Sequence, residues 1–185
     1  CMVDGITKKS ISAMLGTIIG VVFSGAFALI FGQVTSITGY NVSDIENLVY
    51  VGEMTDIKIG ELLFAGILIA SLGAVMDVGM SIASTLNELK EQNPQMMLKE
   101  LFQSGMNVGR DMMGTMTNTL ILAFTGGSIN TLVFIFAYNY EYQQVINMYS
   151  VGIEIMQGLS SSLGVIMAVP VTSWIAAFLY SKNQK

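Results

Sequence analysis

The chain has 185 residues, of which 52% are hydrophobic and 11% are charged, and its net charge is −5. Soluble domains are about 25% charged, so this composition predicts an integral membrane protein. The chain has no His and a single Cys, which argues against a metal site. It has no phosphate-binding glycine loop, which argues against a nucleotide cofactor. It has no long basic cluster, which argues against a nucleic-acid partner.

The first predicted membrane span covers about residues 11–32, inside a long stretch without charge. A helix needs about 20 mostly apolar residues to cross a bilayer. Gly16, Gly20 and Ser24 recur at every fourth position, a pattern that lets another helix approach closely, so we expect a structural packing face there. Because the chain starts at Cys1, we expect it to be the C-terminal part of a longer protein.

The second predicted span covers about residues 60–86 and contains an intramembrane acid, Asp77. An ionised carboxylate in hydrocarbon costs about 2.5–3.5 kcal/mol on insertion scales. Ser81, Ser84 and Glu88 follow on the same helix face, which predicts a path for a proton or cation towards the cytoplasm. The alternative is a neutral Asp77 that makes a structural hydrogen bond to a neighbouring helix.

An amphipathic helix is predicted over about residues 94–111, beginning at the Asn-Pro pair at 93–94. Its apolar residues gather on one side, so it is expected to lie on the cytoplasmic membrane surface. Asn107, Arg110 and Asp111 near its end are expected to have a structural, interfacial role.

The third predicted span covers about residues 114–138, with a kink or re-entrant break at the Gly-Gly pair at 126–127. Thr117 and Asn118 lie inside this span. A buried amide needs hydrogen-bond partners, and Asp77 is a candidate partner for Asn118. Thr117 and Asn118 are therefore predicted to line the same path as Asp77.

The fourth predicted span covers about residues 152–180. Glu154 begins a polar stripe at its outer end and is a further candidate for the path, the alternative being a position among the lipid headgroups. Pro170 removes a backbone hydrogen bond in mid-span. It indicates either a structural kink or a broken helix of the kind that lines transport paths.

The distribution of basic residues favours four spans with both ends of the chain in the cytoplasm. In that topology Lys58 is the one basic residue outside and the other seven are inside, as the positive-inside rule requires. A five-span alternative moves Lys182 and Lys185 outside. The predicted fold is therefore an all-α transmembrane helix bundle of about four spans plus one cytoplasmic amphipathic helix, forming one domain in the plasma membrane.

Three segments carry a resemblance to a known family: GAVMDVGMSI at 73–82, SGMNVGRDMMGTMTNTLILAF at 104–124 and LSSSLGVIMAVPVTSWIAAFL at 159–179. They closely resemble the YibE/F-like family of bacterial multi-pass membrane proteins. The resemblance implies a membrane protein, in some members a transporter, with no established substrate. A weaker likeness, of topology alone, is to half of an RND or SecD/SecF-type permease, although this chain has one Asp where many of those have a pair.

Two functions follow from these features. The leading hypothesis is a permease-type subunit that uses Asp77 for proton or cation coupling. The alternative is a non-catalytic assembly subunit that works with a second multi-pass protein or as a homo-oligomer. Enzyme activity is not expected, because a diaspartyl site needs two carboxylates that meet and Asp111 is predicted at a different depth from Asp77.

Overall fold

The computed structural model describes residues 7–35 and 59–181. These residues form six helices: α1 (Lys8–Thr35), α3 (Ile59–Gln92), α4 (Leu98–Gly127), α5 (Ile129–Ala137), α6 (Tyr142–Ile146) and α7 (Tyr149–Ser181). No strand occurs in this part of the chain, so the predicted all-α class is confirmed. Cys1, Lys58, Lys182 and Lys185 lie outside the described residues.

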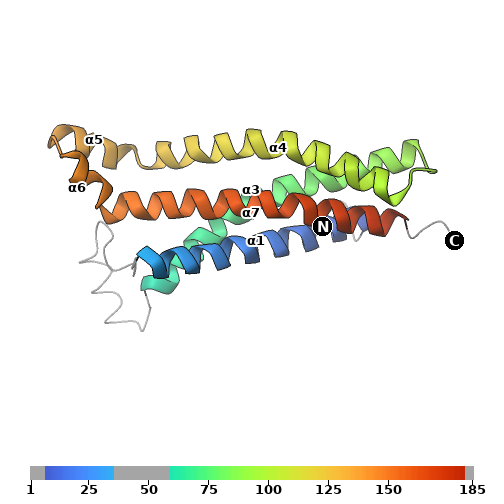
Figure 1. Cartoon of the computed structure of the whole chain (residues 1–185), viewed down its shortest axis with the longest axis horizontal. Coiled ribbons are helices and arrows are strands. Elements are labelled where there is room, and N and C mark those ends of the chain that lie inside the picture. The colour runs from blue at the N-terminus through green and yellow to red at the C-terminus, as the bar shows by residue number, and fades with distance from the viewer. Residues whose placement is uncertain (1–6, 36–58, 182–185) are drawn as a thin grey trace.

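The four long helices run side by side, and the short α5 and α6 lie together at one end of the bundle (Figure 1). α7 packs against α1, α3 and α4, so it is the central helix. The beginning of α1, the turn between α3 and α4 and the end of α7 all lie at the opposite end from α5 and α6.

Three helical segments are long and apolar enough to cross a membrane: Lys8–Thr35, Phe64–Gln92 and Tyr149–Ser181. α4 and α5 meet the same criterion only as a pair, which is bent by 55° at the break between them. Three to four spans agree with the predicted helical membrane bundle. The break follows Gly127, where the sequence predicted a kink or re-entrant turn.

Small residues let α1 approach α7 and α3 closely. A Cβ atom at Gly20 would lie 2.6 Å from Val75 Cγ1 and 3.1 Å from the carbonyl oxygen of Gly164, and one at Gly16 would collide with Thr172. This face of α1 is therefore filled within the chain itself. It does not require a helix from another subunit.

The segment after α3 differs from the predicted element boundaries. Residues 93–97 form a turn, in which the Lys90 ammonium donates hydrogen bonds of 2.8 and 2.9 Å to the carbonyls of Pro94 and Met96. α4 then runs unbroken from Leu98 to Gly127. The predicted amphipathic helix and the first half of the predicted third span are thus one helix, because nothing interrupts it between residues 111 and 114.

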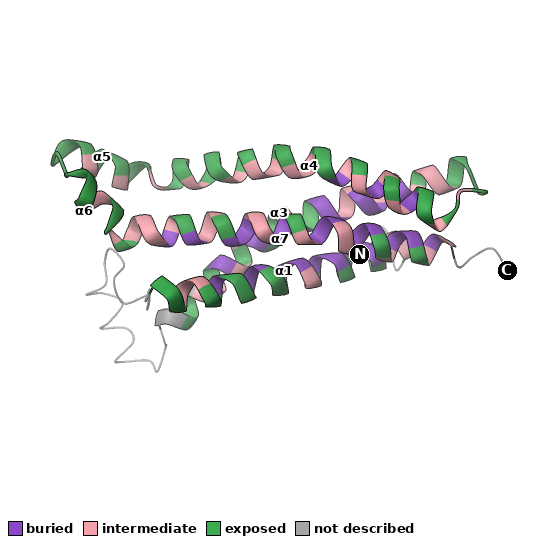
Figure 2. Cartoon of the chain, in the orientation of Figure 1, coloured by how far each residue is buried: buried purple, intermediate pink, exposed green. Residues whose placement is uncertain are grey.

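α4 is buried only in its first half, at Leu101, Gly105 and Gly109. These residues face α7 and α3, since a Cβ atom at Gly105 would lie 2.8 Å from Ser173 Oγ and 3.1 Å from Leu86 Cδ1. The second half of α4 is mostly exposed (Figure 2). The apolar side of the predicted amphipathic helix is therefore a contact with the bundle.

Candidate functional site

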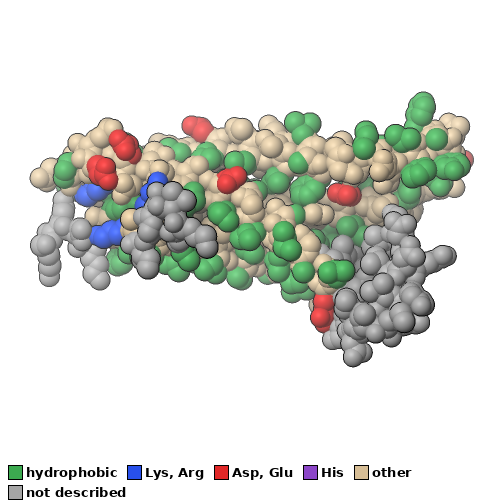
Figure 3. Space-filling model, turned by 180° about the vertical axis from the view of Figure 1, so that it is seen from behind, with side chains coloured by type: hydrophobic (Ala, Val, Ile, Leu, Met, Phe, Trp, Pro, Cys, Tyr) green, Lys and Arg blue, Asp and Glu red, His purple; other side chains and the backbone are tan. Residues whose placement is uncertain are grey.

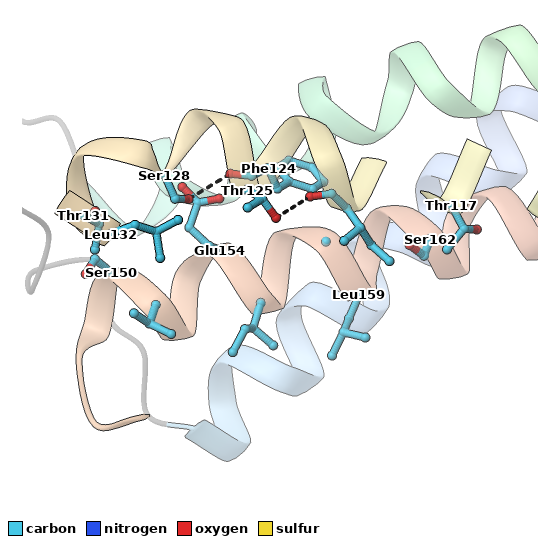
Figure 4. A pocket seen from close by; sticks show the side chains of 14 residues that line it. Thr117, Phe124, Thr125, Ser128, Thr131, Leu132, Ser150, Glu154, Leu159 and Ser162 are labelled. Atoms are coloured by element: carbon cyan, nitrogen blue, oxygen red, sulfur yellow. Dashed lines mark hydrogen bonds between the residues drawn. The ribbon is translucent and has the colours of Figure 1, made fainter. Parts of the chain in front are cut away.

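A cavity of about 420 Å³ lies between the second half of α4, α5 and the first half of α7 (Figure 4). Its walls contain a carboxylate, several hydroxyls and apolar side chains; they are Thr117, Ile121, Phe124, Thr125, Ser128, Thr131, Leu132, Ser150, Val151, Glu154, Ile155, Gly158, Leu159 and Ser162. The cavity exists because α4 gives way to α5 through the 55° bend while α7 continues as one helix.

Glu154 is the one charged residue among the described residues of the cavity wall. Its side chain reaches from α7 towards the break between α4 and α5, where Ser128 lies (Figure 4). The Ser128 hydroxyl donates to the carbonyl of Phe124 at 2.9 Å, and the Thr125 hydroxyl donates to that of Ile121 at 2.7 Å. Both hydroxyls thus donate to carbonyls of α4, and no hydrogen bond from the described residues reaches the Glu154 carboxylate.

Of the residues singled out from the sequence, Thr117 and Glu154 line this cavity together. Thr117 lies near Ser162 and well apart from Glu154 (Figure 4). The sequence pattern does not point to four further hydroxyls of the cavity wall, those of Ser128, Thr131, Ser150 and Ser162. The Gly-Gly pair before the break was the available signal for them, because a bend there folds α5 back towards α7.

Asp77 lies elsewhere, on the outward side of α3. Val75, Val78 and Ile82 are fully buried on the side of α3 that packs against α1, α4 and α7, and at about 100° per residue Asp77 falls on the outward side of the helix. Asp77 is exposed. It is not part of the Glu154 cavity.

Ser81 and Ser84 continue from Asp77 along the same outward side and are half-buried. Ser84 and Glu88 border a shallow groove of about 310 Å³ near the end of α3. The polar stripe predicted from the spacing is therefore present on one face of α3, and it runs over the surface of the single chain.

Asn118 is also exposed, on the outward side of α4. No hydrogen bond joins Asn118 to Asp77 within the part of the chain that the structure describes. Asn107, Arg110 and Asp111 are exposed on α4 as well. Neither Arg110 nor Asp111 has an ion-pair partner among the described residues. Pro170 lies inside α7, which is continuous through it.

Charge is distributed unevenly over the bundle. The Lys and Arg side chains visible in Figure 3 lie together at one end, whereas Asp and Glu are spread along the length. Lys8 and Lys9 begin α1, Lys90 lies in the last turn of α3, and Lys99 lies in the first turn of α4. The described Lys residues therefore gather at one end of the bundle, where Glu88, Glu91 and Glu100 also lie.

Helices long and apolar enough to cross a membrane, with the described Lys residues gathered at one end, define a helical integral membrane protein. Within this class, the sequence of residues 1–182 matches the YibE/F-like protein family. The chain belongs to this family, as the resemblance predicted. No curated protein and no solved structure matches it.

Proposed function

We propose that the chain is a transport-type subunit of the plasma membrane in which Asp77 couples movement of a substrate to a proton or cation. The end of the bundle that carries Lys8, Lys9, Lys90 and Lys99 faces the cytoplasm, in accordance with the positive-inside rule, which counts Lys and Arg. The described ends of α1 and α7 at this end of the bundle are then cytoplasmic.

The observation that carries the proposal is the exposure of Asp77 on a helix that is apolar and long enough to span the membrane. An ionised carboxylate facing lipid is costly, and intramembrane acids normally face water or protein. Ser81 and Ser84 extend this polar surface towards the groove at Glu88. These groups support a hydrated path from Asp77 to the cytoplasm, closed on its outer side by another protein surface.

The Glu154 cavity supports the second part of the proposal, which is a place for the substrate. Small-molecule sites have volumes of about 300–1,000 Å³, and this cavity measures about 420 Å³. Apolar walls around one carboxylate favour a small organic molecule with a positively charged group. Thr117 and Ser162, near one another in the wall, supply hydroxyls for its polar atoms.

The test is ion flux through the purified full chain in vesicles of phosphatidylethanolamine and phosphatidylglycerol. A pH-sensitive dye inside the vesicles reports proton entry under an imposed potential, and parallel samples measure Na⁺ and K⁺. We expect the Asp77→Asn variant to lose the flux of the wild-type chain. The matched control is Met76→Leu, at a neighbouring exposed position, which should retain it. Equal flux in both variants, or none in the wild type, would overturn the proposal.

The second candidate is the assembly subunit, which is favoured by the amount of polar surface that the single chain leaves exposed on α3 and α4. In that case Asp77→Asn would reduce recovery of the chain from membranes together with a partner. Purification of wild-type and variant protein from native membranes distinguishes the two functions, since loss of flux at unchanged recovery supports the permease.

A further inference from the structure

The outward side of α4 has the wrong composition for contact with lipid. Between Met97 and Ile121 no large hydrophobic side chain of α4 is exposed. The exposed residues in that interval are Lys99, Glu100, Gln103, Asn107, Arg110, Asp111, Gly114, Thr115, Asn118 and Thr119. We call the part formed by Asn107, Arg110, Asp111, Gly114 and Asn118 the α4 outer face.

This face lies at the level of the apolar belt of the bundle. Gly109, directly before Arg110, packs on Val169 of α7, and Gly16 of α1 packs on Thr172, less than one turn further along α7. At this level α1 and α7 expose large apolar side chains: Leu15, Ile18, Ile166 and Trp174. Arg110 and Asp111 therefore lie at the same level as apolar surfaces of α1 and α7 that are suited to hydrocarbon, and neither has an ion-pair partner among the described residues.

Arg110 and Asp111 are placed so that they can pair with the same two residues of an identical copy of the chain. Arg110 and Asp111 are one residue apart, so they lie about 100° apart around the helix and at nearly the same depth. Around the axis of α4, Asn107 and Gly114 lie between Arg110 and Asp111. Asn107 is about one helical turn before the two charges and Gly114 is about one turn after them. The two charges thus stand on either side of a line that runs through Asn107 and Gly114, and this line points away from the bundle.

We propose that a second copy of the chain covers the α4 outer face in a two-fold symmetric dimer, with the two α4 helices parallel. Two copies inserted in the same orientation are related by an axis along the membrane normal, and each contact then occurs twice. Across that axis Arg110 of one copy faces Asp111 of the other, which forms two reciprocal ion pairs. The pairing needs no charge from a different protein.

Gly114 fits this arrangement because a Cβ atom there would meet nothing within 4 Å in the part of the single chain that the structure describes. A glycine on the line of contact lets two membrane helices approach closely. Asn107 lies near the same line, where paired asparagines favour a parallel dimer. The inference does not depend on transport, since an assembly subunit would dimerise through the same residues.

Disulfide cross-linking in membranes tests the contact directly. Cys1→Ser removes the one native thiol of the chain, and Gly114→Cys then places a thiol on the line of contact. Oxidation should convert this variant into a covalent dimer of the chain. Val22→Cys, on the apolar exposed side of α1, is the matched control and should stay monomeric. A Gly114→Cys variant that stays monomeric, or links only to a different protein, overturns the proposal.

Charge exchange tests the reciprocal pairs. Arg110→Asp alone and Asp111→Arg alone each place like charges opposite one another in a homodimer, so each variant should lose the dimer. The two variants expressed together with different tags should form a mixed dimer, because every facing pair is then opposite in charge. We expect the mixed dimer to exceed both homodimers by about tenfold, or about 1.4 kcal/mol. A random mixture, or homodimers as abundant as those of the wild type, contradicts the proposal.

Discussion

Gly20 of α1 and Gly164 of α7 meet backbone to backbone. A Cβ atom on either glycine would lie 3.1 Å from the carbonyl oxygen of the other. Association of membrane helices depends on close packing, because the surrounding lipid is itself apolar. This crossing therefore holds α1 against the central helix, and it also sets how near α3 can come through Val75.

Gly20→Ala should destabilise the bundle by about 1–3 kcal/mol, the range usual for overpacking. The added methyl group would lie 2.6 Å from Val75 Cγ1 and 2.9 Å from Ala168 Cβ, neither of which is the end of a flexible chain. Gly66→Ala is the control, since a Cβ atom there meets no described residue within 4 Å. Thermal unfolding of both variants in mild detergent measures the difference, and equal midpoints would show that the close crossing is not maintained.

Thr172→Val should stabilise the chain by about 1 kcal/mol. The Thr172 hydroxyl is fully buried and has no hydrogen-bond partner among the described residues, and an unpaired buried polar group costs about 1–3 kcal/mol. Thr17→Val is the matched comparison, because the Thr17 hydroxyl is also buried but donates to the carbonyl of Ala13 at 2.8 Å. That variant should be neutral or less stable. Chemical denaturation of the two variants should therefore give changes in the free energy of unfolding of opposite sign. A loss of stability in Thr172→Val would indicate that the Thr172 hydroxyl has a hydrogen-bond partner such as a bound water.

The membrane spans could be predicted from the sequence because they depend on local composition. Long apolar runs locate α1, α3 and α7, and the four-residue spacing of Gly16, Gly20 and Ser24 identifies the side of α1 that now lies buried. α4 was harder to delimit. Its outward side is polar and its inward side depends on glycines, so its pattern resembled a surface helix followed by a separate span.

The direction in which Asp77 points could not be read from spacing alone. A helix pattern shows that Asp77, Ser81 and Ser84 share a face, but the packing of α3 on α7 and α4 decides whether that face is inside or outside the bundle. The Glu154 cavity likewise arises from the bend between α4 and α5. These are tertiary features, set by contacts between segments far apart in the sequence.

Asp77→Leu should leave the stability of the solubilised chain within about 0.5 kcal/mol of the wild type, as is usual for surface substitutions. Its carboxylate makes no hydrogen bond or ion pair in the described part of the chain, so no internal interaction is lost. Ile82→Ala, on the buried side of the same helix, is the positive control for the assay. It should lower the free energy of unfolding by about 2–5 kcal/mol. A comparable loss for Asp77→Leu would instead support the structural hydrogen bond that the sequence left open.

Gly158→Leu should fill the Glu154 cavity and stabilise the chain. A Cβ atom at Gly158 lies 3.5 Å from Phe124 Cδ2, an ordinary contact distance, and the rest of the side chain extends into about 420 Å³ of space. Replacing a mid-helix glycine adds about 1 kcal/mol of helix propensity. Gly109→Leu is the opposite case, because a Cβ atom at Gly109 would collide with Val169 Cγ1, and this variant should unfold at a lower temperature. If the cavity is the substrate site of the proposed permease, Gly158→Leu should also abolish transport while the protein becomes more stable. An unchanged transport rate in a stabilised Gly158→Leu variant would place the substrate elsewhere.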